Sequence, residues 1–308
     1  MITHHASRGL VWLDILSPND EEIAGLVKRY SLHPLVGEEL KSSSSLAKID
    51  FYKDYILVVL TLPVRVRKDD SYEIVDREVD FVIGKNFLIT SRFDTIEQLE
   101  YFAKIFEANS ILNKEEKMEH AGHLFYYMVK RIYAGMCEDL ENIKDSLVTA
   151  ETHIYKGDER KMVEALSNLS RELIDFKQTA RVHEEIWADM IGYDETSIFG
   201  KDFTVYMRDM RDEFNRIREL ISNARELLAD LRQTNDSLLN TKQNEIIKVL
   251  AIVSFIFNPL IFITSLFTIP AASVPIVGHS WGWTALFIFM LLISAGIWWY
   301  FKKKKWVE

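Results

Sequence analysis

Polar and small side chains recur through the most apolar stretch of this chain, at a spacing that keeps them together. Five of them follow one another at steps of three, four or seven residues: Asn244, Ala251, Ser254, Asn258 and Ser265. Ile247 and Ile261 occupy the remaining steps of the same series. A repeat near 3.5 residues stays on one face of a helix. Because an amide in hydrocarbon costs a few kcal/mol without partners, Asn258 must face protein or water.

This polar stripe has two interpretations. In the first, small and polar residues pack membrane helices together, and Asn258 forms hydrogen bonds between helices. In the second, several copies of the helix surround a channel, and the stripe lines it. Because a single helical hairpin cannot enclose a pore, the second interpretation requires an oligomer. The stripe alone leaves both open.

The remaining candidates for chemistry are weaker. His120 and His123 fall on neighbouring helix positions with no evident third metal ligand, so packing histidines are the favoured interpretation. His4 and His5 are expected to lie in a frayed terminus. Several acidic side chains cluster and favour solvated helix faces, with cation sites between subunits as the alternative: Glu138, Asp139, Glu141, Glu184 and Glu185.

The chain has neither a phosphate-binding glycine loop nor a nucleophile elbow, and His183-Glu184-Glu185 lacks the second histidine of a zinc protease. These absences favour a protein that is not an enzyme. The net charge of −9 argues against a nucleic-acid partner. A single cysteine, Cys137, excludes an internal disulfide and suits a reducing compartment. The N-terminus has no apolar core typical of a secretory signal peptide.

The stripe lies in the first of two apolar runs, residues 249–267 and 283–301, inside a block without any Lys, Arg, Asp or Glu. Each run approaches the roughly 20 residues that a membrane-spanning helix needs. Residues 268–282 between them contain two prolines and two glycines and predict a short loop. The C-terminal part is therefore predicted to be a transmembrane hairpin.

Flanking cations predict the orientation of this hairpin. Lys302, Lys303, Lys304 and Lys305 follow the second run, Lys248 precedes the first, and the loop has no cation. The positive-inside rule then places both termini in the cytoplasm of a multi-pass inner-membrane protein. Tryptophans at both ends of the second run are typical of interfacial aromatic belts.

The first 110 or so residues alternate between strand and helix patterns and predict a small mixed α/β unit. Strands are expected at residues 11–15, 55–66, 72–83 and 87–90, the last two forming a hairpin. A helix is expected to start with Ser17 as its cap and Pro18 in the first position. Another is expected after Asp94.

Helical periodicity dominates the following residues, with single helices expected at 114–155 and 158–191. From Phe203 no proline or glycine interrupts the pattern before the membrane, which predicts one helix of about 65 residues and ~100 Å. The predicted divisions are a cytoplasmic domain (1–202), a stalk (203–248), a first span (249–267), an outer loop (268–282), a second span (283–301) and a basic tail (302–308).

Several motifs resemble the CorA superfamily of divalent-cation channels and transporters, and the resemblance covers almost the whole chain. They are WLDILSPNDEE, LHPLVGEEL, IDFYKDYILVVL and VDFVIGKNFLITSR in the N-terminal part, and NEIIKVL and IFNPL around the first span. The ending WWYFKKKKW is similar to the zinc-transporting ZntB branch.

The resemblance implies a homopentameric funnel with an α/β/α cytoplasmic domain, a long stalk helix that lines the pore, and a second helix outside it. Asn244 then matches a pore-lining asparagine. The implied partners are other copies of the chain, the lipid bilayer and metal cations. No covalent cofactor is implied, and a divalent cation such as magnesium, zinc, cobalt or nickel is the transported or regulatory ion.

One departure concerns selectivity. The family ends its first span with Gly-Met-Asn, or Gly-Ile-Asn in the ZntB branch, where this chain has Thr268, Ile269 and Pro270. Proline offers neither a side-chain hydrogen-bonding group nor a backbone N–H at the pore mouth. We therefore expect a cation channel or transporter with altered selectivity. The alternative is a non-transporting relative that acts as a membrane scaffold or regulator.

Overall fold

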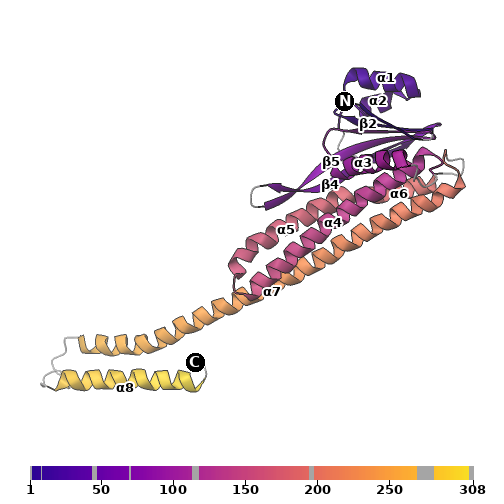
Figure 1. The fold of residues 1–308 in the computed structure, drawn as a ribbon. Helices are drawn as coiled ribbons and strands as arrows, with labels where there is room; N and C mark the ends of the chain where they lie inside the picture. Colours follow the sequence, from indigo (N-terminus) through magenta and orange to yellow (C-terminus); the bar gives the residue numbers. More distant parts are fainter. Residues whose placement is uncertain are drawn as a thin grey trace. The chain divides into compact units, whose positions relative to one another are not determined.

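The computed structural model describes residues 2–7, 9–43, 47–68, 71–112, 118–193, 198–268 and 281–304. It divides into two compact units, Met1–Arg232 and Gln233–Glu308. The first unit contains a sheet and most of the helices, and the second contains the apolar C-terminal helices (Figure 1).

A six-stranded mixed sheet forms the centre of the first unit. Its strands are β1 (Ile2–Ser7), β2 (Leu10–Leu16), β3 (Lys48–Phe51), β4 (Tyr55–Lys68), β5 (Ser71–Gly84) and β6 (Phe87–Arg92), in the order β1-β2-β6-β5-β4-β3. Only the β2–β6 pair is parallel among these described strands. The predicted hairpin of β5 and β6 is confirmed, with Ile83 opposite Leu88.

Helices cover both faces of this sheet (Figure 1). On one face, α1 (Asp20–Tyr30) and α2 (Pro34–Glu39) bury Ile23 and Val36 against strand residues such as Leu13. On the other, the Trp12 ring meets the edge of Phe102 from α3 (Glu97–Leu112), and Phe81 meets Phe125 from α4 (Ala121–Tyr155). The predicted α/β/α arrangement is confirmed.

The long helices correspond to the predicted ones, with two corrections. Helix α4 begins at Ala121 rather than at residue 114, because the described residues 118–120 are not helical. The helix expected at 158–191 is two helices, α5 (Glu159–Ala180) and α6 (His183–Gly192), because the chain leaves the helix at Arg181 and Val182. After a short 3-10 turn, η1 (Lys201–Phe203), helix α7 runs without interruption from Thr204 to Thr268, which confirms the predicted 65-residue helix. Helix α8 (Gly282–Lys303) follows.

Two predictions near the N-terminus are wrong. Asn19, not Ser17, caps α1: the Asn19 side chain accepts from the Glu22 N–H, and the Glu22 carboxylate accepts from the Asn19 N–H. This reciprocal capping box satisfies the backbone donors of Asn19 and Glu22. His4 and His5 belong to strand β1 rather than to a frayed end, because the His5 ring stacks on Trp12 at 4.4 Å.

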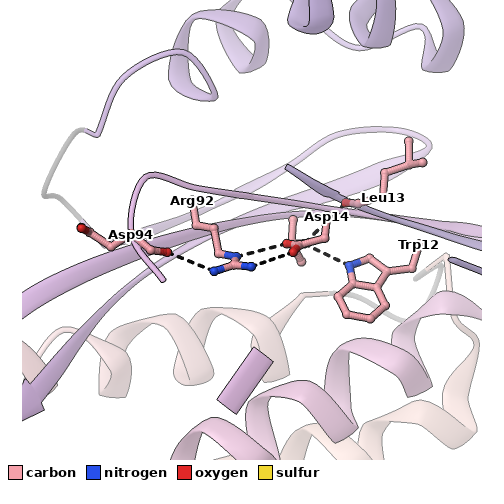
Figure 2. A network of polar contacts seen from close by, with 6 residues as sticks. Trp12, Leu13, Asp14, Arg92 and Asp94 are labelled. Atoms are coloured by element: carbon pink, nitrogen blue, oxygen red, sulfur yellow. Dashed lines mark hydrogen bonds and ion pairs between the residues drawn. The ribbon is translucent and has the colours of Figure 1, made fainter. Parts of the chain in front are cut away.

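A buried ion pair fixes the register of the parallel strands β2 and β6. The Arg92 guanidinium donates to both oxygens of Asp14, at 3.3 and 2.9 Å, and to the Asp94 carbonyl (Figure 2). The Thr90 hydroxyl donates to Asp14 at 2.7 Å and accepts from the Trp12 indole at 3.0 Å. A one-residue slip would leave a buried carboxylate without its partners, which is a large penalty.

Candidate functional site: the polar stripe of α7

The predicted pore-lining residues all lie on α7, as the helical spacing requires. Six of the seven are exposed in the single chain, and Ala251 is half-buried. These six are Asn244, Ile247, Ser254, Asn258, Ile261 and Ser265. The stripe is therefore available for contact with another chain or with water, although the structure of one chain does not test its pore-lining role.

The hydroxyl groups of Ser265 and Thr268, near the end of α7, donate to backbone carbonyls of the same helix. Ser265 donates to the Ile261 carbonyl at 2.8 Å, and Thr268 donates to the Ser265 carbonyl at 2.8 Å. Since each hydroxyl proton is bound to the helix backbone, the lone pairs remain for a cation or for the hydrogens of its hydration water. Hard divalent cations prefer such oxygen ligands.

Asn258 is the strongest polar group of the stripe. Its exposed side chain forms no hydrogen bond with the residues that the structure describes. The adjacent Pro259 has no N–H, so the carbonyl one turn earlier also loses its usual helical donor. Both groups need a partner inside a membrane, and water in a pore or another helix would supply it.

Of the three predicted selectivity positions, only Thr268 lies within the described residues, as the last residue of α7. Ile269 and Pro270 lie outside them. Helix α8 begins beside the exposed Trp281 and ends in lysines that lie over aromatic rings one turn earlier. Lys302 lies 4.9 Å from the Trp298 ring and Lys303 lies 5.3 Å from the Trp299 ring, an arrangement suited to a membrane interface.

The histidine pair of the first unit is a packing element. His120 precedes α4 and His123 lies in its first turn, with the two rings 4.1 Å apart against Phe203. Burial lowers the pKa of both imidazoles, that of His120 to about 4. Across residues 2–304, outside the undescribed gaps, no three His, Cys, Asp or Glu side chains come together as metal ligands.

The predicted acidic clusters are partly engaged in other contacts. Asp139 accepts a hydrogen bond from the Arg65 N–H, and Glu184 pairs with Arg218 of α7. Burial raises the pKa of Asp139 to about 6, which indicates a carboxyl enclosed within its own chain. Their alternative role as cation sites between subunits stays untested.

Among the residues that the structure describes, two helices are long and apolar enough to span a membrane: α7 with its preceding turn, and α8. Over residues 7–303 the sequence matches the family described as CorA-like Mg2+ transporter protein. The chain belongs to the CorA-like family. It is thus a membrane protein of a transporter family, which also agrees with the prediction that it is not an enzyme.

Two CorA proteins are similar to this chain over most of their length. The cobalt/magnesium transport protein CorA of Thermotoga maritima is 24% identical over 304 residues, covering 96% of this chain and 83% of that protein. The complete structure of the CorA magnesium transporter from Methanocaldococcus jannaschii superposes with a TM-score of 0.83 at 20% identity, covering 98% and 93% of the two chains. This structural likeness confirms the predicted CorA-type fold.

The ZntB cytoplasmic domain from Vibrio parahaemolyticus is also similar, with a TM-score of 0.60 at 13% identity, covering 76% of this chain and 89% of that one. The similarity supports a shared fold for the cytoplasmic part. Since that structure is of a cytoplasmic domain, it does not address the predicted likeness of the two C-terminal endings.

A buried network that the sequence patterns do not predict joins α4, α6 and β4 of this CorA-like chain. The Trp187 indole donates to the Tyr133 oxygen at 2.7 Å, and His183 Nε2 lies 2.8 Å from the Thr61 carbonyl. Because a carbonyl can only accept, Nε2 carries the proton, and the Tyr133 hydroxyl donates to His183 Nδ1 at 2.9 Å. The signal available in the sequence was limited to His183 and Trp187, which lie one helical turn apart on α6.

Removing the central hydroxyl of this network should destabilise the first unit. In Tyr133→Phe, His183 Nδ1 and Trp187 Nε1 both lose their partner in a fully buried site. We expect a loss of about 2–4 kcal/mol, since each unsatisfied buried group costs roughly 1–3 kcal/mol. Urea unfolding followed by tryptophan fluorescence measures it. Tyr155→Phe, an exposed tyrosine at the end of the same helix, is the control and should change little.

The histidine pair predicts a specific loss of stability in acid. In the unfolded chain His120 takes up a proton as the pH falls below its ordinary pKa of 6.5, whereas the folded imidazole does so only near pH 4. The contribution of neutral His120 to the free energy of unfolding is therefore fully present above pH 6.5 and is lost between pH 6.5 and 4. At pH 5 the loss is about 2 kcal/mol.

The free energy of unfolding should be compared between His120→Phe and the unsubstituted protein at each pH. The comparison is needed because Asp139, whose pKa is raised in the folded protein, stabilises the fold as the pH falls and so opposes the effect of His120. Phenylalanine suits the aromatic surroundings, and His120 makes no capping hydrogen bond that would be lost. We expect the two unfolding free energies to converge, or to reverse in order, between pH 7.5 and pH 5. Parallel curves would contradict the assigned pKa.

Proposed function

We propose that this protein is an oligomeric channel or transporter that moves divalent cations such as magnesium, cobalt, zinc or nickel across the inner membrane. The observation that carries the proposal is the family match over residues 7–303, which includes both apolar helices. The CorA proteins of T. maritima and M. jannaschii are named as cobalt/magnesium transport proteins. We also propose that both termini lie in the cytoplasm, as the lysines at the end of α8 favour.

In this proposal, five copies of α7 surround the pathway, and the polar stripe faces it. Partly hydrated cations would pass Thr268, Ser265 and Asn258 and then Ser254 and Asn244. The hydroxyl oxygens of Ser265 and Thr268 suit this role, because their lone pairs can accept from hydrated cations or bind them. The hydrophobic stripe residues Ile247 and Ile261 narrow the path between the polar positions.

Selectivity is proposed to differ from that of relatives with Gly-Met-Asn, because Thr268-Ile269-Pro270 replaces that motif. The threonine hydroxyl partly compensates, but proline offers no side-chain oxygen. The outer loop has no acidic residue, so local enrichment of cations should be weaker.

Reconstitution into liposomes tests the proposed function. Purified protein of confirmed oligomeric mass should accelerate the entry of at least one of magnesium, cobalt, nickel and zinc over empty liposomes, measured with ion-specific dyes. Absence of flux for all four ions in well-folded oligomers would overturn it. The second candidate, a scaffold or regulator without transport, rests on the replaced motif and would then be favoured.

A further inference from the structure

A basic cavity lies in the first unit, between the end of α5, the start of α6 and the middle of α7. Its volume is about 340 Å³, and its lining includes Lys177, Arg181, Arg218 and Arg225, with Glu184 the only acidic residue. This size falls within the range of small-molecule sites, roughly 300–1,000 Å³. The chain as a whole carries a net charge of −9, so the positive charge of the cavity is opposite in sign to the net charge of the protein.

The spacing of these cations along their helices brings their side chains to the same cavity. Lys177 and Arg181 are one turn apart, and Arg218 and Arg225 are two turns apart on α7, so each pair shares a helix face. Arg218 pairs with Glu184 across the cavity. Among the residues that the structure describes, the side chains of Lys177, Arg181 and Arg225 have no ion-pair partner. The cavity therefore holds three cations that have no carboxylate partner, two of them at the C-terminal end of α5.

Like charges one turn apart on a helix repel each other and destabilise it by a few tenths of a kcal/mol per pair. A multivalent anion would relieve this repulsion and bind at the same time. Guanidinium groups suit phosphate in particular, because their planar set of donors matches two phosphate oxygens. The Ser222 hydroxyl at the same wall adds a further donor.

The floor of the cavity is apolar. Phe214, Ile221 and Ala180 form it and are almost fully buried from solvent in the single chain. These core residues leave only a small apolar area open to a ligand, so the exposed cations at the rim supply most of the possible contacts. We propose that this cavity binds a small molecule with two or more linked phosphate groups. The proposal rests on the first unit alone and does not depend on the proposed transport function.

Direct binding to the full-length, detergent-solubilised protein tests the site. Isothermal titration in buffer with chelator avoids any effect of nucleotides on free magnesium. ATP, ADP and inorganic tripolyphosphate are the probes, and adenosine is the uncharged comparison. We expect saturable binding of at least one phosphate probe and none of adenosine. If ATP binds more tightly than tripolyphosphate, the nucleoside part contacts the protein and the ligand is a nucleotide. If the two bind equally, the phosphates alone are recognised and the ligand is an inorganic polyphosphate.

Substitutions locate the binding. Arg181→Ala and Arg225→Ala should each weaken the Kd about tenfold or more, because each removes charge-assisted hydrogen bonds. Arg171→Ala on α5 and Arg208→Ala on α7 remove the same charge outside the cavity and should leave the Kd within about twofold. Thermal unfolding without ligand checks that all four variants are folded. No saturable binding, or equal effects of all four substitutions, would overturn the proposal.

Discussion

Replacing Asn258 with leucine should reduce cation flux by roughly ten- to hundredfold in proteoliposomes. In the proposed oligomer the substitution removes one amide per subunit from the same level of the pathway. A hydrogen bond to a charged or strongly polarised group contributes about 1.5–3 kcal/mol, so losing it raises the barrier by that amount. Leucine also makes this level apolar, and apolar constrictions exclude water.

A matched control separates this effect from a general disturbance of α7. Thr264→Val removes a hydroxyl of the same helix two turns later, away from the stripe, where the hydroxyl is bound to the Leu260 and Ile261 carbonyls. We expect Thr264→Val to keep most of the flux. Equal flux in Asn258→Leu and the unsubstituted protein would show that Asn258 lies off the pathway and favour its role in packing helices.

Converting Thr268-Ile269-Pro270 to Gly-Met-Asn should raise magnesium flux relative to that of the other divalent cations. Asparagine at position 270 would supply an amide oxygen at the proposed mouth, where proline supplies no polar side chain. Glycine at position 268 would permit conformations that threonine resists. We expect the ratio of magnesium to cobalt flux to increase at least several-fold.

The control for this conversion is Ile269→Met alone, which keeps Thr268 and Pro270 and should leave the ratio unchanged. If the unsubstituted protein shows no flux and the triple substitution restores it, the native motif is the block, and the rest of the pathway is competent. If the triple substitution changes neither flux nor selectivity, the three positions do not set selectivity in this chain.

Sequence patterns predicted the helices of the membrane part because the physical signals there are simple. An uncharged block of about 50 residues followed by lysines has few interpretations other than a spanning hairpin. The length of α7 followed equally directly from the absence of proline and glycine between Thr204 and Asn258. Helical periodicity also placed the polar stripe on one face without any knowledge of neighbouring helices.

The features that the sequence patterns did not predict, strand β1 and the break between α5 and α6, depend on tertiary contacts. The short strand β1 reads as a polar terminus, but its pairing with β2 and the stacking of His5 on Trp12 hold it in the sheet. The break between α5 and α6 at Arg181 has no proline or glycine, and it allows His183 to reach the Thr61 carbonyl of β4. Such a break follows from long-range hydrogen bonding and not from local propensity.

The capping error at α1 has a local cause. Both Ser17 and Asn19 are good capping residues, and Pro18 suits a first helical position. The Asn19–Glu22 pair completes a capping box, so the helix begins two residues later than predicted. A search for the three-residue spacing of the two partners would have found it.

The most direct test of the central claim is the reaction of cysteines along α7 with a water-soluble thiol reagent during flux. Cys137, the only native cysteine and a buried one, is first replaced by alanine. Ser254→Cys and Ser265→Cys lie on the stripe, and Phe255→Cys and Phe262→Cys lie off it. We predict that the reagent blocks flux through the first two variants and spares the others. Block that is equal at all four positions, or absent from the stripe, would contradict a pathway lined by this face of α7.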